Sequence, residues 1–422
     1  MQCDKNLIVI YLIVLIWLKM EKICDFDKCT ACNACRVACP KQCITMQNDK
    51  LLVPHPFIDK DKCIDCGLCK KVCPVNNPLN LKKSIKVYAA WSNDDIIRSN
   101  SASGGIATEI YKYFLDNEQN SYLLGTCFNS NFEVEYVPID SFEQLQEIQN
   151  SKYVYSNTLN IYSEIKEKLK RNCKVLFVGL PCHVAGLKGY LRKEYSNLLT
   201  IDLVCHGVAP SDYLKQHIES IRNKIMKPVN QISFRDPLFL TYTFTFTLKS
   251  NGEVNYKKKV YEDDVYQLGY HKALIYRENC YHCQYAQRNR ISDLTLCDFT
   301  GVGAYASFNY SKNNVSCILV NTEKGEELLN SIKSQITLIE RPMNEVYDFE
   351  GQLNAPYRPH PKRSKFVDLL AKTSDFEYAA SEALKYDIFH YKFQKSFIGK
   401  GLCLFKKIIR KGKNVIKNKI NY

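Results

Sequence analysis

The stretches "CTACNACRVACP" (residues 29–40) and "CIDCGLCKKVCP" (residues 63–74) decide how the first part of this chain folds. Both read C-x2-C-x2-C-x3-C-P, and the pattern is specific because two copies occur in tandem. Three closely spaced thiolates on a tight loop can hold three corners of one cubane, while the fourth cysteine is carried to a second cubane. The two copies therefore predict a pair of 4Fe–4S clusters.

The same spacing assigns the cluster ligands. One cluster is expected on Cys29, Cys32, Cys35 and Cys73, and the other on Cys63, Cys66, Cys69 and Cys39. Pro40 and Pro74 fix the chain direction after each fourth ligand. A structural zinc site with four thiolates is the alternative, but a zinc site does not require this spacing of cysteines and proline. Cys24 and Cys43 stand outside the rhythm, and we expect them to be small buried side chains.

The composition is that of a large globular protein with an unusual number of cysteines. The chain has 422 residues, enough for two or three domains, with 45% hydrophobic and 24% charged residues. It contains 20 cysteines. Because disulfide scaffolds are usually small, clustered cysteines in a chain of this size favour metal ligands in a reducing compartment. We therefore expect a cytoplasmic protein.

The net charge of +14 is concentrated at the C-terminal end. Residues 396–422 contain seven Lys, one Arg and no acidic residue, so the preceding 395 residues carry only about +6. That small excess argues against nucleic-acid binding. The tail interleaves lysines with apolar residues at helical spacing, which predicts an anionic membrane surface or an acidic protein as its partner. A membrane partner would make the protein peripheral at the inner face of the membrane; a solvated terminal helix is the alternative.

Residues 1–19 include the apolar run "LIVIYLIVLIWL" at 7–18. Twelve residues are too few to span a bilayer comfortably, and Lys19-Met20-Glu21 offers no small residues for a signal cleavage site. Our hypothesis is that residues 1–19 are a misassigned upstream extension and that Met20 is the natural start. A short membrane-associated anchor is the alternative.

The rest of the chain predicts an α+β protein in several parts. Bacterial ferredoxins use the same cysteine run, so residues 20–80 are expected to form a ferredoxin-type module. After it, strand-like and helix-like patterns alternate, which predicts an α/β core in two parts, residues 85–205 and 206–345. A helical region with the basic tail follows at 346–422. Apolar runs predict buried strands at 174–180 and 198–205, helical patterns are found at 104–117, 161–171 and 184–193, and Asn251-Gly252 predicts a hairpin turn.

Four further cysteines are candidate metal ligands, and two of them lie in "RENCYHCQYAQRNRISDLTLCDF" (277–299). The Cys280/Cys283 pair of this stretch supplies half of a tetrahedral site. Cys182 and Cys205 each follow a predicted buried strand, and the carboxyl ends of such strands cluster at one edge of an α/β sheet. Each cysteine alone is more readily a buried structural thiol. Together they make a set of four thiolates, although their spacing in sequence does not show that they meet.

Five stretches of the chain, in this order, resemble a known family. They are "SASGGIATEIYKYFL" (101–115), "SKYVYSN" (151–157), "VGLPCHVAGLKGYL" (178–191), "VCHGVAPS" (204–211) and "CYHCQYAQRNRISDLTLCDFTGVG" (280–303). The resemblance is to the beta subunits of coenzyme F420 hydrogenases and dehydrogenases, whose bacterial and plant relatives include the 7-hydroxymethyl chlorophyll a reductases. It extends over residues 85–330, and a tandem ferredoxin motif in front is a common arrangement in that family.

The resemblance implies a core that binds FAD and a third 4Fe–4S cluster. The ligands implied for that cluster are Cys182, Cys205, Cys280 and Cys283. The turn of Ser103, Gly104 and Gly105 opens a helix, where backbone N–H groups are expected to receive the FAD pyrophosphate; a simple helix cap is the alternative. Lys152 is expected to stabilise the anionic reduced flavin and Tyr153 to cover its ring.

Pro181 and His183 are expected beside the same pocket, and three positions there depart from the family pattern. His183 stands where relatives commonly have Gln, Cys297 where they have Gly, and Thr300 where many have Trp. His183 is a candidate proton donor near the flavin, but a hydrogen bond to the backbone is the favoured alternative. Cys297 is a rival cluster ligand, for which we favour a packing role.

These observations predict an iron–sulfur flavoprotein oxidoreductase. It would pass electrons between 4Fe–4S clusters and FAD, to or from a hydride-accepting partner or substrate, and would exchange them with an electron-donor or electron-acceptor protein or a small redox coenzyme. A deazaflavin coenzyme, a nicotinamide and a biosynthetic intermediate are all compatible with the sequence. The alternatives are a non-catalytic electron-transfer subunit that serves a partner enzyme, and a scaffold whose Cys280/Cys283 pair binds zinc.

Overall fold

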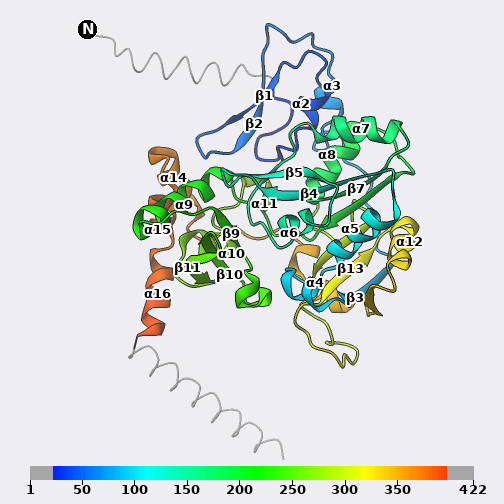
Figure 1. The fold of residues 1–422 in the computed structure, drawn as a ribbon. Coiled ribbons are helices and arrows are strands. Elements are labelled where there is room, and N and C mark those ends of the chain that lie inside the picture. The colour runs from blue at the N-terminus through cyan, green and yellow to red at the C-terminus, as the bar shows by residue number, and fades with distance from the viewer. Residues whose placement is uncertain (1–21, 397–422) are drawn as a thin grey trace, which may run out of the picture.

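The computed structural model describes residues 22–396, so the expectations for residues 1–19 and for the tail at 397–422 lie outside the described residues. Figure 1 shows the cysteine-rich module in blue, a large mixed sheet, and a smaller sheet beside the C-terminal helices. The predicted α+β class, with a small N-terminal module in front of a mixed core, is confirmed.

The N-terminal module consists of two short helices and a hairpin. Its elements are α2 (Ala34–Ala38), β1 (Ile44–Asn48), β2 (Pro54–Ile58) and α3 (Leu68–Lys71). Strand β1 pairs antiparallel with β2, and the carboxylate of Asp49 accepts the N–H groups of Leu51 (2.8 Å) and Val53 (3.0 Å) in the turn between them. Each helix lies inside one cysteine motif, so the hairpin separates the two copies.

A nine-stranded sheet forms the centre of the protein, in the order β14-β3-β13-β12-β8-β7-β4-β5-β6. Its strands are β3 (Lys86–Ser92), β4 (Ser121–Phe128), β5 (Val134–Ile139), β6 (Ser156–Asn157), β7 (Lys174–Gly179), β8 (Leu198–Leu203), β12 (Leu294–Asp298), β13 (Ser316–Val320) and β14 (Ile336–Glu340). The central strands β4, β7, β8 and β12 run parallel, whereas β13 and β5 join them antiparallel. The two predicted buried strands are β7 and β8, which are neighbours.

Helices cover both faces of this sheet. They are α4 (Asp95–Asn100), α5 (Ile106–Asn117), α6 (Gln144–Ile148), α7 (Ile161–Lys170), α8 (Pro181–Leu191) and α12 (Glu323–Ser331). Buried residues of α5, α6 and α12 pack on one face, and those of α7 and α8 pack on the other. The module lies over α7 and α8 (Figure 1), and its Ala34 and Val72 share their hydrophobic cluster.

The second part of the core is built around a three-stranded sheet. Its elements are α9 (Ser211–Ile225), β9 (Gln231–Ser233), the short helices η1 (Pro237–Phe239) and η2 (Thr241–Thr243), β10 (Thr245–Ser250), β11 (Glu253–Lys259), α10 (Val265–His271), α11 (Glu278–Tyr281), α14 (Arg363–Thr373), α15 (Phe376–Ala383) and α16 (Lys385–Lys395). Two short helices, α13 (Asn344–Tyr347) and η3 (Gly351–Leu353), pack instead against β3 and β13 of the large sheet. The predicted hairpin is confirmed: Asn251 and Gly252 turn the chain between β10 and β11 with φ of 51° and 86°. Positive φ at both positions is typical of a tight hairpin turn.

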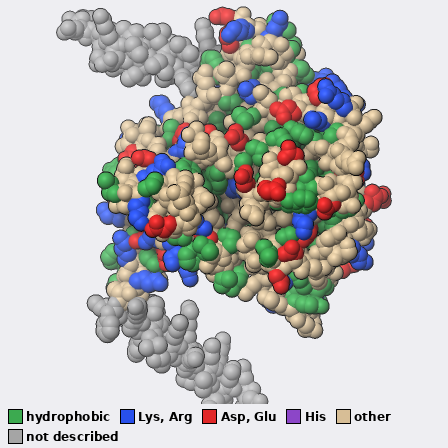
Figure 2. Space-filling view, viewed as in Figure 1, with side chains coloured by type: hydrophobic (Ala, Val, Ile, Leu, Met, Phe, Trp, Pro, Cys, Tyr) green, Lys and Arg blue, Asp and Glu red, His purple; other side chains and the backbone are tan. Residues whose placement is uncertain are grey.

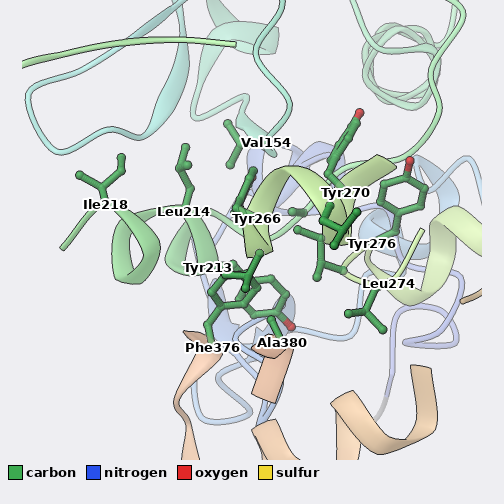
Figure 3. Packing of buried hydrophobic residues seen from close by; sticks show 14 of the residues in the cluster. Val154, Tyr213, Leu214, Ile218, Tyr266, Tyr270, Leu274, Tyr276, Phe376 and Ala380 are labelled. Carbon is green, nitrogen blue, oxygen red and sulfur yellow. The ribbon is translucent and has the colours of Figure 1, made fainter. Parts of the chain in front are cut away.

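Aromatic packing joins the C-terminal helices to this part of the core. Figure 3 shows Tyr213 of α9 against Phe376 of α15, and Tyr266 of α10 nearby. The Tyr213 and Phe376 rings stack with centroids 5.0 Å apart. Stacked pairs of this kind stabilise a core beyond the burial of their area. The helices of the predicted region 346–422 that can be described are therefore part of the folded body.

A buried histidine holds the same helices together. His217 of α9 is 3% exposed; its Nε2 lies 2.9 Å from a carboxylate oxygen of Asp264, and its Nδ1 pairs with Glu377 of α15. Tyr256 donates a further hydrogen bond to Asp264 (2.9 Å). Although burial opposes it, the attraction of the two carboxylates raises the pKa of His217 to about 10.

This raised pKa makes stability depend on pH. The imidazolium contributes stability that is complete below its unfolded pKa, about 6.5, and is lost as pH rises toward 10. We expect His217→Gln to be less stable than the parent chain at pH 6.5, with the difference shrinking by up to about 1.4 kcal/mol per pH unit above it. Urea unfolding at pH 6.5 and 9.5 measures this; a difference that does not change with pH contradicts it. His390→Gln, on exposed α16, is the control.

The surface shows mixed charge. Within residues 22–396, no helix has the length and apolar character needed to cross a membrane. On the face shown in Figure 2, Lys and Arg side chains alternate with Asp and Glu. This face therefore presents no broad surface of one sign.

Candidate functional site

The two cysteine loops of the module have the same backbone conformation. Left-handed φ angles occur at Ala31 (51°) and Asp65 (50°), and again at Asn33 (62°) and Gly67 (69°). These are equivalent positions, just before and just after the second cysteine of each motif. Residues other than glycine rarely adopt positive φ, and such strain clusters where a loop wraps a ligand. The repeated strain indicates one kind of ligand for both loops.

The thiols of the module gather in two groups. We define the first set as Cys29, Cys32, Cys35 and Cys73, and the second set as Cys39, Cys63, Cys66 and Cys69. Burial, followed by the charges of the other three first-set thiols, raises the pKa of Cys35 well above its usual value. Burial, with the other three second-set thiols adding to it, likewise raises the pKa of Cys69. Cys35 and Cys69 therefore each lie close to the other three thiols of their own set.

The two sets face different surroundings. Cys32 of the first set is buried against α8, where a Cβ placed on Gly186 would approach Cys32 Sγ to 2.9 Å. Cys66 of the second set is exposed. Cys24 and Cys43 are buried, as predicted, and each lies against one set: Cys24 hydrogen-bonds the Cys29 thiol, and Cys43 Sγ is 3.3 Å from Cys39 Sγ. The first set thus faces the core and the second faces solvent.

A pocket at the edge of the large sheet contains all four of the other singled-out cysteines. Cys182 follows β7 in the first turn of α8, and Cys205 follows β8, so two adjacent parallel strands deliver them to one edge. Cys280 and Cys283 belong to α11 and the turn after it. All four line the pocket, and burial followed by the Cys205, Cys283 and Cys280 thiols raises the pKa of Cys182. The structure therefore brings the four cysteines together.

The charged part of the 277–299 stretch fixes the chain beyond Cys283. Arg290 is 2% exposed, donates to the Tyr285 carbonyl (2.9 Å), and pairs through Nη2 with the Asp202 carboxylate on β8 (3.1 Å). Its backbone N–H and carbonyl both bond to Lys82, each at 2.7 Å. The fully buried Asp202 in turn accepts from Thr295 of β12. This network holds the turn after Cys283 against the sheet.

The four core thiols match the number of ligands that one 4Fe–4S cluster takes. Among the described residues, no three His, Cys, Asp or Glu side chains converge closely enough to hold one metal ion. A cubane takes one thiolate at each of four separate corners, so its ligands stand further apart than those of a zinc ion. Four cysteine side chains that surround one pocket fit that requirement.

Hydrogen bonds attach the first set of the module directly to this pocket. The Tyr155 hydroxyl donates to the Ala31 carbonyl (2.6 Å), and the Thr158 hydroxyl donates to the Cys32 carbonyl (3.0 Å). Asn33 donates to the side chains of Asn157 and Thr158, each at 3.0 Å. Tyr155 also lines the pocket. The module is thereby docked with its first set next to the four core cysteines.

The Ser103-Gly104-Gly105 turn is held tightly between two strands. Gly104 N–H donates to Ser316 Oγ (2.8 Å), and Ser103 Oγ donates to the Val315 carbonyl (2.9 Å). A Cβ on Gly104 would lie 2.3 Å from the Ala90 carbonyl oxygen, which only glycine avoids. Gly105 starts α5 with a φ of 83° and without a side-chain cap. The N–H groups of the first turn of α5 are the donors that this turn presents.

Lys152 and Tyr153 lie together after α6. The Lys152 ammonium donates to the carbonyls of Ile148 and Gln149, both at 3.2 Å, and burial lowers its pKa to about 8. The Tyr153 ring stacks on Tyr270 of α10, with centroids 4.7 Å apart. Tyr270 also donates to the carbonyl of Gly207 (2.9 Å), a residue that lines the four-cysteine pocket. Tyr153 is therefore connected to that pocket through Tyr270.

Arg235 is a buried cation beside the glycine turn that no sequence motif indicates. It is 3% exposed, donates to the Ala102 carbonyl of the glycine turn, pairs with Asp298 at the end of β12, and lies 3.7 Å from the Phe244 ring centroid. Its Nε has no protein partner among the described residues. No motif surrounds Arg235, and its partners are distant in sequence, so only the folded chain reveals it.

His271 adds a second buried polar atom without a partner in the described part of the chain. Its Nε2 is buried and unpaired within the described part of the chain, and its ring meets Tyr153 and Phe244 edge-on, at 5.5 and 6.0 Å. Burial lowers the pKa of His271 to about 3, so the ring is neutral near pH 7. Unpaired polar atoms beside stacked aromatic rings fit a bound polar ring system such as a flavin.

Pro181 and His183 both line the four-cysteine pocket, at the start of α8. The His183 ring is fully buried, and its Nδ1 lies 3.0 Å from the Tyr136 hydroxyl rather than from a backbone group. Its Nε2 has no partner among the described residues. Burial, with repulsion from Arg277, lowers the pKa of His183 to about 3. The ring is therefore neutral near pH 7.

The other two departures from the family pattern lie away from the four thiols. Cys297 on β12 is directly opposite Cys317 on β13, and the two thiols hydrogen-bond. Cys297 does not line the pocket of the four thiols. Its partner Cys317 is fully buried in a separate hydrophobic cluster. The Thr300 hydroxyl lies 3.4 Å from the Glu350 carboxylate.

The fold and its cysteine loops define an iron–sulfur protein in which a two-cluster ferredoxin-type module precedes an α/β core. The family model described as a 4Fe–4S dicluster domain matches residues 28–77. Two family models of the coenzyme F420 hydrogenase/dehydrogenase beta subunit match the core. The model of the N-terminal part matches residues 87–163, and that of the C-terminal part matches residues 172–346. The chain belongs to this family of beta subunits.

Individual relatives are distant in sequence. The chain is 24% identical over 347 residues to a subunit of the F(420)H(2) dehydrogenase of Methanosarcina mazei, covering 77% of this chain and 88% of that protein. It is 23% identical over 329 residues to the coenzyme F420-dependent sulfite reductase of Methanocaldococcus jannaschii, 75% of this chain but 47% of that protein. A chain in the structure of the F420-reducing NiFe hydrogenase complex from Methanosarcina barkeri aligns over 75% of this chain and 94% of its own length, with 18% identity and a TM-score of 0.44.

Proposed function

We propose that this chain is an iron–sulfur flavoprotein oxidoreductase that passes electrons between 4Fe–4S clusters and FAD, to or from a hydride-accepting partner. In this proposal residues 20–80 carry the ferredoxin-type clusters, and residues 85–205 and 206–345 form the catalytic core. The observation that carries the proposal is the convergence of Cys182, Cys205, Cys280 and Cys283 on one pocket between the docked module and the Tyr153 region.

The four core cysteines are the proposed ligands of a third cluster. Their side chains come from three separate segments, and the network of Arg290 and Asp202 holds the last of them in place. A bound 4Fe–4S cluster exchanges single electrons, and a bound flavin exchanges one electron or two. The chain itself supplies burial, fixed spacing and the charges around each site.

Lys152, Tyr153 and Arg235 are the proposed flavin contacts. With a pKa of about 8, the buried Lys152 ammonium is still largely protonated at pH 7, and such a cation stabilises an anionic reduced ring. Tyr153 offers an aromatic surface, and Arg235 links that surface to the Ser103-Gly105 turn through Ala102. Because its donors lie at the start of α5, we assign this turn to the pyrophosphate.

The hydride partner is proposed to be a deazaflavin coenzyme. The names of both curated relatives include coenzyme F420. A nicotinamide is the competing partner. Anaerobic mixing with reduced F420 and with NADH, each followed by the flavin absorbance, separates the two: bleaching by reduced F420 alone supports the proposal, and bleaching by NADH alone contradicts this choice of partner.

Cofactor analysis of anaerobically purified protein tests the proposed function. Three clusters predict about twelve iron atoms per chain together with one FAD. A non-catalytic electron-transfer subunit that lacks the core cofactors would contain about eight iron atoms and no flavin. Zinc in place of the third cluster would identify the scaffold alternative. Either of the last two compositions refutes the proposal.

A further inference from the structure

Arg277 is a buried cation without a carboxylate partner. Its side chain is 1% exposed, and no Asp or Glu lies within ion-pair distance of it among residues 22–396. Its Nε is buried and has no hydrogen-bond partner there. A buried charge is costly unless an opposite charge compensates it. The compensation for Arg277 must therefore come from something other than a carboxylate.

The guanidinium group lies between two sets of cysteines. On one side, Nη1 donates to the Thr30 carbonyl (2.9 Å) and Nη2 to the Cys29 carbonyl (3.2 Å), within the first-set loop. On the other side, Arg277 lines the pocket of the four core cysteines, and its carbonyl accepts the Cys280 N–H (3.0 Å). The guanidinium carbon lies 4.8 Å from the centroid of the Tyr155 ring.

The second set is the more exposed of the two sets in the module. Its Cys66 is exposed, whereas Cys32 of the first set is buried against Gly186 of α8, which also carries Cys182. One helix thus contacts the first set and supplies a core cysteine. Among the described residues, Arg277 is the buried cation common to these two sites.

We propose that Arg277 is the shared counter-charge of the first-set cluster and the core cluster, and that it raises the reduction potential of both. This inference rests on the proposed function. A cluster held by four thiolates is anionic and becomes more negative on reduction, so a nearby buried cation favours the reduced form. The same contacts make the first set the point where the module meets the core, and leave the second set as the outer site for an electron-carrying partner.

Redox titration of the full-length holoprotein, followed by electron paramagnetic resonance, tests this charge. In Arg277→Gln we expect the midpoints of the first-set and core clusters to fall by about 59 mV, which corresponds to a tenfold lower ratio of reduced to oxidised cluster at a fixed potential. The second-set midpoint should not move. Cys32→Ser and Cys66→Ser assign the module signals to their clusters. Arg277→Lys keeps the charge, so its midpoints should lie close to those of the parent chain. Substitution of the exposed Arg288 by Gln should change none of the midpoints.

The outcomes separate this inference from the proposed function. If Arg277→Gln retains about twelve iron atoms while its midpoints do not change, or all three change equally, the role of Arg277 is refuted and the proposed function stands. A parent chain with fewer clusters refutes the proposed function itself. If Arg277→Gln does not assemble its clusters, the electron paramagnetic resonance spectrum of the partly reduced parent chain is measured instead. Splitting of the core-cluster signal that is still present in Cys66→Ser supports the arrangement. Splitting that is lost in Cys66→Ser overturns it.

Discussion

The Cys280→Ser variant should hold about eight iron atoms per chain where the parent chain holds about twelve, because one of four thiolate ligands of the proposed core cluster is removed. Cys280 lines the pocket with Cys182, Cys205 and Cys283, and no other cysteine of residues 22–396 lines it. A spare thiol from the described chain therefore cannot take its place. Iron analysis after anaerobic purification, together with the visible spectrum, measures the loss.

Cys297→Ser is the matched control for that variant. Cys297 follows Cys283 in the same stretch of sequence, but it lies opposite Cys317 across β12 and β13 and does not line the pocket. It should keep all of the iron. A Cys280→Ser protein with its full iron content and flavin spectrum would show that the four cysteines do not hold a third cluster.

Removing the Arg290 side chain should produce the largest loss of stability. Arg290 and Asp202 are 2% and 0% exposed, and removing one partner leaves an uncompensated buried charge, which costs about 3–5 kcal/mol. We therefore expect Arg290→Ala to unfold at clearly lower urea concentration than the parent chain. Because the Tyr285 carbonyl also loses its donor, the turn after Cys283 should become more accessible to proteolysis.

Arg288 provides the comparison two residues away. It is exposed, and its guanidinium contacts the Tyr347 ring and the exposed Asn354. Surface substitutions of this kind usually change stability by less than about 0.5 kcal/mol. If Arg288→Ala and Arg290→Ala shift the urea midpoint equally, the buried pair is not what holds this segment. The double variant Arg290→Met/Asp202→Leu should recover part of the loss, since no lone charge remains.

Local patterns predicted the parts of the site that are built from neighbouring residues. The two cysteine motifs assigned both sets of module thiols because each loop contains three of its ligands within seven residues. The strands that precede Cys182 and Cys205 were predicted from their apolar runs, and their parallel pairing delivers both residues to one sheet edge. The hairpin at Asn251-Gly252 was likewise specified by its own turn residues.

Contacts between distant segments were not predictable in the same way. Residues 206–345 divide between two sheets: β9, β10 and β11 form one of their own, while β12, β13 and β14 return to β8 and β3. Periodicity gives no information on which remote strand a strand will pair with. The role of Arg235 could not be predicted for the same reason, because the Ala102 carbonyl to which it donates is 133 residues away in sequence. The close contact of Gly186 with Cys32 depends on how the module docks, which no single segment encodes.

The attachment of the module to the core has a mechanical consequence. Ferredoxin-like segments joined by a flexible tether can swing between a donor and an acceptor, and their turnover is then limited by that movement. Here Tyr155, Thr158 and Asn33 join the first cysteine loop to the core through buried hydrogen bonds. The module is thus a fixed junction and not a shuttle. In the proposed function, an outside carrier would therefore have to come to the exposed Cys66 loop while the module stays attached to the core.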